Sequence, residues 1–137
     1  MCIARYLAAK FNLAGSTEQE KAEVEMYCEI LNSLFVQLAS VQAGDEADKA
    51  RLAEQFLAEP FVKCMTYLEE KLARTSTGYL VGNSLTVADL YATVVLDLII
   101  SSNVMENLFE GFARVRSHRL RVRAVAAVKN WNTAHNQ

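Results

Sequence analysis

The apolar run from Val87 to Ile100 is the feature that most limits what this chain can fold into. It is apolar on nearly every side, which is typical of a helix surrounded by other helices. Asp89 and Asp97 bracket the run, and it falls short of the ~20 residues that cross a bilayer. We therefore interpret it as a core helix and expect no membrane association.

An aspartate in the first turn of an apolar helix needs a structural reason. Thr86 and Asp89 stand three residues apart directly before the run, which predicts a capping box in its aspartate variant. Because the helix is apolar around most of its circumference, we expect its start to be buried, where free backbone amides cannot bind water. We predict a structural role for Thr86 and Asp89, since no second acid, histidine or nucleophile lies near them in the sequence.

Further helices are predicted before this run. Thr17 and Glu20 form another capping box, and apolar residues then recur at intervals of three and four until Gly44. A second long helix spans Leu52 to Leu72, and Pro60 should kink or divide it.

The remaining segments complete a fold class. After the core helix, the pattern predicts a short helix around Val104 to Phe109 and a last helix from about Ser117 to Thr133. With 5 Gly, 1 Pro and no strand-like alternation of apolar and polar residues, the chain is predicted to be all-α. We expect about five helices after a short helical leader.

Composition excludes several function classes. Lys and Arg total 14 against 16 Asp and Glu, so the net charge of -2 gives no overall attraction to nucleic acid. The basic stretch Arg114 to Arg123 has valines at helical spacing and no interleaved aromatic residues, which favours a solvated helix face over an RNA-binding surface.

The three cysteines are widely spaced and form no metal motif with histidine, so we predict buried thiols and no metal site. The beginning of the sequence has no secretory signal pattern, and we expect a cytoplasmic protein.

Three stretches together resemble a known family. GYLVGNSLTVADLY, Gly78 to Tyr91, resembles the motif G-x-x-L-V-G-x-x-L-T-x-A-D that opens the central helix of the all-helical domain in cytosolic glutathione transferases. CIARYLAAKFNLAGSTEQEKAEVE, from Cys2, resembles the passage that leaves the thioredoxin-like domain of that family and enters its first long helix. VRAVAAVKNW resembles the last helix, although Ala113 and Ala126 stand where the family often has prolines. The sigma class, which includes hematopoietic prostaglandin D synthase, is the most similar.

The resemblance implies a division of the chain. Residues 1–10 would be the remnant of the last helix of a thioredoxin-like domain, 11–16 the linker, and 17–137 the all-helical domain. The family binds glutathione, its cosubstrate, mainly on the thioredoxin-like domain. The resemblance therefore assigns no catalytic residue to this chain and implies that it is inactive alone.

The resemblance also implies a substrate site. The helical domain supplies the wall of the hydrophobic site in this family, and the matching positions here are Phe35, Tyr91, Val94 and Val95. Asn32 stands where the family often has an aspartate that reaches the glutathione of the neighbouring subunit, and an amide brings no charge to that contact. The implied full-length protein is a homodimer that conjugates glutathione to small hydrophobic electrophiles in detoxification, or isomerises molecules with it. Two other functions remain open: a noncatalytic interaction module of the kind found in elongation-factor and tRNA synthetase complexes, and a protein that only binds apolar ligands.

Overall fold

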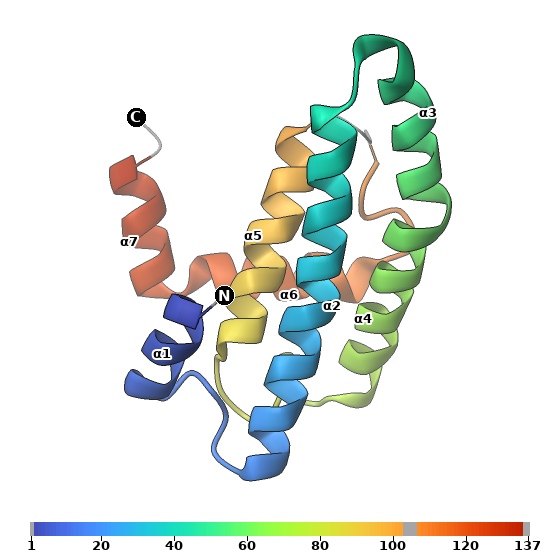
Figure 1. Cartoon of the computed structure of the whole chain (residues 1–137). Helices are drawn as coiled ribbons and strands as arrows, with labels where there is room; N and C mark the ends of the chain where they lie inside the picture. The colour runs from blue at the N-terminus through green and yellow to red at the C-terminus, as the bar shows by residue number, and fades with distance from the viewer. Residues whose placement is uncertain (1, 103–106, 136–137) are drawn as a thin grey trace.

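The computed structural model describes residues 2–102 and 107–135, and within these ranges the secondary structure is helical, without strands, as the sequence predicts. Three long helical segments form the body of the molecule (Figure 1). Helix α2, Glu18–Ala43, and helix α5, Val87–Ser101, run in the same direction, and the segment between them in sequence runs in the opposite direction. No helix in the described part of the chain has both the length and the apolar character needed to cross a membrane.

Helix α2 begins and ends where its sequence predicts. The Glu20 amide donates to the Thr17 hydroxyl over 3.1 Å, and the Glu20 carboxylate accepts the Thr17 amide, which completes the first capping box. Gly44 follows the last helical residue. Its φ of -66° needs no glycine, but a Cβ there would lie 2.7 Å from Leu52 Cδ1, so packing is the constraint.

The antiparallel segment is divided at its proline. It consists of α3, Glu46–Phe56, a π-helical turn, Leu57–Phe61, and α4, Val62–Arg74. Pro60 lacks an amide donor, so the regular hydrogen-bond pattern cannot continue through it, and the wider turn forms there. The predicted break at Pro60 is therefore confirmed.

The core lies between these helices, and α5 is its centre. Apolar side chains from α2, α4 and α5 are buried, together with Leu80 and Val81 of the loop that precedes α5. Cys28 on α2 and Cys64 on α4 are buried free thiols, whereas Cys2 is exposed. Burial raises the pKa of both buried thiols to about 11.

The last part of the chain differs from the prediction. In place of one helix from about Ser117, the structure has α6, Ala113–Ala124, and α7, Ala126–His135, separated by an extended Val125 with a ψ of 128°. Helix α6 starts early because the Glu69 carboxylate of α4 accepts the amides of Arg114 and Val115 at 3.0 Å. The predicted helix from Val104 to Phe109 falls partly outside the described residues, and Leu108 and Phe109 belong to a turn.

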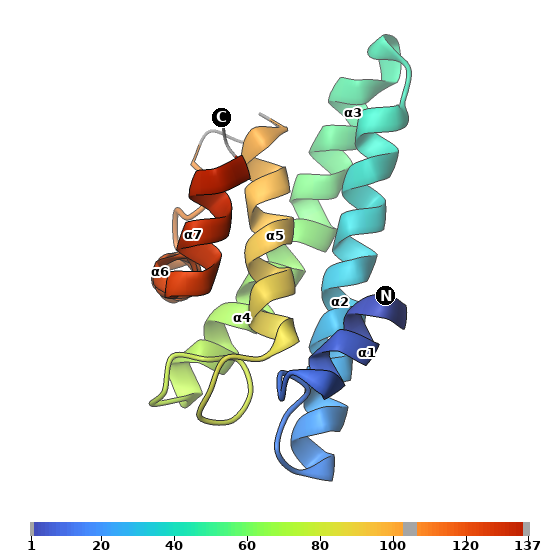
Figure 2. The same cartoon turned by 90° about the vertical axis from the view of Figure 1, so that its left-hand side faces the viewer.

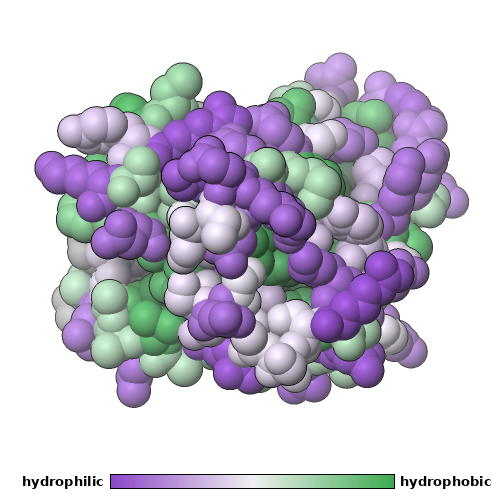
Figure 3. Space-filling model, turned by 90° about the horizontal axis from the view of Figure 1, so that it is seen from below, coloured by the Kyte–Doolittle hydropathy of each residue, from purple (hydrophilic) through white to green (hydrophobic). Residues whose placement is uncertain are grey.

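Helix α6 crosses behind the body of the molecule, and α7 continues from it past α5 (Figures 1 and 2). The helical leader α1, Cys2–Lys10, packs near the start of α5. Its Arg5 pairs with Glu25 and Glu29 of α2, and the Leu13 carbonyl after it accepts the Val87 amide over 2.8 Å. The linker and the loop before α5 thus meet at one end of the molecule, where hydrophilic and hydrophobic residues are interspersed on the surface (Figure 3).

Candidate functional site

Four of the predicted site residues lie on two parallel helices. Asn32 and Phe35 stand three residues apart on α2, and Tyr91 and Val94 stand three apart on α5, so each pair lies on one side of its helix. The Tyr91 hydroxyl donates to Asn32 Oδ1 over 3.1 Å, which joins the two pairs. We call these four residues the α2–α5 face.

The apolar members of this face are open to solvent. Phe35 is 38% exposed and Val94 is 52% exposed, whereas Tyr91 is half-buried. Partial burial is the main cause that raises the pKa of Tyr91, so its hydroxyl stays protonated and acts as a donor. The face can therefore contact an apolar molecule and offer it one polar group.

Val95 does not belong to this face. It is 0% exposed and packs in the core, because the residue after Val94 on a helix points about 100° away from it. Its side chain contributes to the stability of the bundle and does not reach the surface of the α2–α5 face.

The start of α5 is organised around Asp89, which is fully buried. The structure confirms the capping box of Thr86 and Asp89: Asp89 Oδ2 accepts the Thr86 amide over 2.8 Å and the Thr86 hydroxyl over 2.9 Å. Its other oxygen, Oδ1, accepts the Leu80 amide and His118 Nε2, both over 2.8 Å. The carboxylate thus joins the loop, the start of α5 and helix α6.

The role of His118 was not predicted from the sequence. It lies between Val115 and Val122 at helical spacing, and all three are buried. That spacing was the available signal, because it places the histidine in the apolar stripe of α6.

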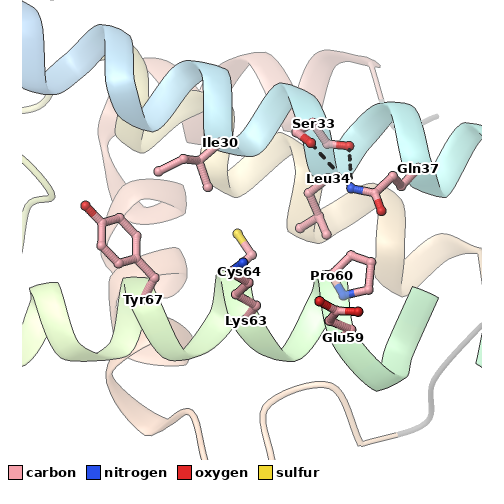
Figure 4. A pocket seen from close by; sticks show the side chains of 9 residues that line it. All are labelled: Ile30, Ser33, Leu34, Gln37, Glu59, Pro60, Lys63, Cys64 and Tyr67. Carbon is pink, nitrogen blue, oxygen red and sulfur yellow. Dashed lines mark hydrogen bonds between the residues drawn. The ribbon is translucent and has the colours of Figure 1, made fainter. Parts of the chain in front are cut away.

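A groove of about 520 Å³ lies between α2 and α4 (Figure 4). From α2 it is lined by Ile30, Ser33, Leu34 and Gln37, and from the other side by Glu59, Pro60, Lys63, Cys64 and Tyr67. At 3.6 residues per turn, its α2 residues lie on the side roughly opposite Asn32 and Phe35. The groove is therefore separate from the α2–α5 face, and the only sequence signal near it was Pro60.

The groove contains one thiol, that of Cys64. In the groove, the raised pKa of the Cys64 thiol leaves little thiolate at neutral pH. The parts of the chain that the structure describes contain no group of three or more His, Cys, Asp or Glu residues that could hold a metal ion. The exposed apolar side chains of the α2–α5 face and the mixed lining of the groove can each contact a partly apolar molecule.

With this geometry established, comparison with known proteins identifies the family. Residues 31–135 match the family of glutathione S-transferase C-terminal domains. This range covers most of the chain and includes the groove except Ile30, the capped α5, and helices α6 and α7. The chain belongs to this family.

Individual relatives agree with this assignment. The probable glutathione S-transferase 6 of Caenorhabditis elegans is 30% identical over 133 residues, which are 94% of this chain and 64% of that protein. Among solved structures, a monomeric glutathione S-transferase from the hookworm Necator americanus is 29% identical with a TM-score of 0.82, covering 98% of this chain and 66% of that one. A Nu-class glutathione S-transferase from Haemonchus contortus is 30% identical with a TM-score of 0.79, covering 95% of this chain and 64% of that one. The chain thus spans about two thirds of the length of these relatives.

Proposed function

We propose that this chain is the part of a glutathione S-transferase that forms the wall of its hydrophobic substrate site. On this proposal, a thioredoxin-like domain supplies the glutathione site, and the joined protein conjugates glutathione, as cosubstrate, to small hydrophobic electrophiles. The single observation that carries the proposal is the α2–α5 face, where Phe35 and Val94 are exposed beside the Tyr91 hydroxyl in a domain of the transferase family.

Helix α1 supports the proposed division into a remnant at 1–10, a linker at 11–16 and a helical domain at 17–137. Its Ile3 is 78% exposed and Tyr6 is 67% exposed, and Phe11 after it is 62% exposed. Large apolar side chains at such exposure on a short helix favour burial against another domain. Arg5 holds the helix to α2 through Glu25 and Glu29, so the apolar side of the helix stays exposed on the surface.

The contact of Asn32 with a neighbouring subunit is not part of this proposal. Its Oδ1 accepts the Tyr91 hydroxyl and can accept a second hydrogen bond, but the amide carries no charge. It would bind the ammonium group of glutathione more weakly than an aspartate carboxylate, so we do not include this contact. The role of Asn32 within the proposal is to orient Tyr91.

Class and assembly remain predictions. The resemblance predicts the sigma class, while the similar transferase from Haemonchus contortus is of the Nu class. A homodimer was predicted from the family, while the similar transferase from Necator americanus is monomeric. A cytoplasmic location and a role in detoxification likewise rest on the family.

The test is to join the chain to a thioredoxin-like domain from one of its nematode relatives. We expect the isolated chain to show neither transferase activity nor measurable affinity for glutathione, and the fusion to conjugate a standard electrophile. In the fusion, Tyr91→Ala should change the preference among electrophiles by about tenfold while changing the KM for glutathione less than about twofold. Tyr67→Ala is the matched control, because that tyrosine lines the α2–α4 groove.

The outcomes separate the candidate functions. Turnover by the isolated chain, after a mock purification excludes a contaminating transferase, would overturn the assignment of chemistry to the other domain. A folded fusion that binds glutathione but conjugates none of a panel of electrophiles would instead favour a noncatalytic interaction module or a protein that only binds apolar ligands.

A further inference from the structure

The arginines of α6 divide into two groups according to their partners. Arg119 and Arg123 both bind the Asp97 carboxylate of α5, and Arg114 pairs with Glu69 of α4 over 3.3 Å. Within residues 2–102 and 107–135, neither Arg116 nor Arg121 takes part in an ion pair. The basic stretch is therefore only partly neutralised by the bundle.

One of these two arginines lines a cavity. A cavity of about 160 Å³ lies between α6, the end of α4 and the loop before α5, and its lining consists of Leu72, Gly78, Arg114, Ser117, His118 and Arg121. The four α6 residues recur at intervals of three, one and three, so they form one stripe along the helix. Arg114 and Arg121 are about two turns apart in this stripe, and the Ser117 hydroxyl between them in sequence donates to the Ala113 carbonyl over 2.9 Å.

Arg121 is held in place by a glycine. A Cβ on Gly78 would lie 2.8 Å from Arg121 Nε and 2.9 Å from Cζ, so the guanidinium rests directly against the loop backbone. The φ of Gly78 is +74°, which a side chain would also oppose. Packing against the loop restricts the Arg121 side chain before a ligand binds, so Arg121 loses less conformational entropy on binding.

The floor of the cavity is fixed as well. His118 lines it and is bound through Nε2 to the buried Asp89 carboxylate, which also holds the Leu80 amide of the same loop. A ligand in the cavity would therefore contact α6 and the loop, two segments whose relative position is already set.

We propose that this cavity is a binding site for a tetrahedral oxyanion, either free phosphate or sulfate or the phosphate group of a small organic molecule. Planar guanidinium groups bind such oxygens with two parallel hydrogen bonds, and among the described residues Arg121 has no carboxylate competing for it. The cavity has a volume of about 160 Å³, which leaves room for one such group. None of its residues belongs to the α2–α5 face, so the proposal is independent of the transferase function.

The lining favours an anion over a neutral ligand. Arg114 and Arg121, at the two ends of the lining, are both cationic. Within the described ranges, the one carboxylate that contacts either of them is Glu69. Its oxygens also accept the backbone amides that begin α6. The positive charge of Arg121 is therefore left for a ligand.

The test titrates the whole chain with sodium phosphate, sodium sulfate and phenyl phosphate at constant ionic strength, balanced with chloride. Binding is followed by calorimetry and by the amide NMR shifts of Gly78 and Ser117. We expect saturable binding, and Arg121→Gln should weaken it about tenfold or more, because a charge-assisted bond is lost. Arg116→Gln is the matched control: it removes the same charge from the same helix outside the cavity and should change the affinity less than about twofold.

The comparison of the titrated ligands identifies the source of the oxyanion. Tighter binding of phenyl phosphate than of phosphate would assign the site to an organic phosphate, and the reverse would assign it to the free ion. Shifts that do not saturate, or equal weakening by Arg116→Gln and Arg121→Gln, would show only general screening of a basic helix and would overturn the proposal. Arg121→Lys keeps the positive charge, so it distinguishes loss of the guanidinium contact from loss of the folded structure.

Discussion

The buried carboxylate of Asp89 allows a quantitative test of the fold. Replacing it with alanine leaves four donors without an acceptor: the amides of Leu80 and Thr86, the Thr86 hydroxyl and His118 Nε2. The hydroxyl can rotate, but the two amides are fixed by the backbone. Each buried amide without a partner costs about 1–3 kcal/mol, and two of them are left here. We expect Asp89→Ala to lower the free energy of unfolding by about 3–5 kcal/mol.

The other capping box provides the matched control. Glu20 occupies the same position in the box that begins α2, and it accepts the Ser16 and Thr17 amides at an exposed site. Water can replace the carboxylate there, so Glu20→Ala should cost only about 1 kcal/mol. Thr86→Ala removes one of the four donors and should fall between them, at about 1–2 kcal/mol.

The measurement is urea unfolding followed by far-UV circular dichroism, with the free energy extrapolated to zero denaturant. Asp89→Asn is a second probe that keeps the shape. In either orientation its amide nitrogen faces a backbone amide, that of Leu80 or that of Thr86, so we expect a loss of about 2–4 kcal/mol, against less than about 1 kcal/mol for Glu20→Gln. If Asp89→Ala and Glu20→Ala agree within about 0.5 kcal/mol, burial does not control the strength of the cap and the reasoning is refuted.

Three further predictions concern the loop, the last helix and the thiols. Gly78→Ala should destabilise the chain by about 1–2 kcal/mol through its positive φ, and by more while Arg121 is present. A double-mutant cycle with Arg121→Ala should show coupling, and additive effects would contradict the contact. Ala126→Pro should stabilise the chain by about 0.4–1 kcal/mol, because Ala126 is the first residue of α7 and the residue before it is extended. The control, Ala127→Pro, should destabilise the chain. Equal thermal midpoints for the two variants would count against this interpretation. A thiol reagent at pH 8 should react only with Cys2 in the folded chain and with all three thiols in urea, because burial raises the pKa of the other two to about 11. Since the unfolded thiols ionise first as pH rises, the free energy of unfolding should also fall between about pH 9 and pH 11, and a flat profile would refute the raised pKa values.

Local patterns predicted much of the fold because local contacts create those features. The capping boxes at Thr17 and Thr86 connect residues three apart, and Pro60 acts through its own missing amide. The expected burial at the start of α5 is also confirmed, with Asp89 at 0% exposure. These features required no knowledge of the tertiary structure.

The errors arise where a distant residue decides the structure. Helix α6 begins at Ala113 because Glu69, more than forty residues earlier, accepts its first amides. The break at Val125 has no proline or glycine beside it, yet Val125 has the extended conformation that usually precedes a proline. The resemblance had identified Ala126 as a position where related proteins often carry one, but the sequence of this chain has no local signal for the break.

The sequence placed the predicted site residues on the right helices but did not indicate which of them are exposed. Phe35, Tyr91 and Val94 reach the surface on α2 and α5, whereas Val95 is in the core. A helix that is apolar on nearly every side has no polar stripe to indicate which residues point outward. The structure was needed to separate neighbours such as Val94 and Val95.

The partners of Asp89 also set an order of events during protein synthesis. Leu80 and Thr86 leave the ribosome before the aspartate, whereas His118 follows it by 29 residues. At about 5–20 residues per second, that interval lasts roughly 1.5–6 s. During this time the loop amides alone can bind the carboxylate, so the nascent chain can cap α5 before α6 exists. Once His118 is synthesised, its bond to Asp89 adds a long-range contact between α6 and the start of α5 to the local contacts of the loop.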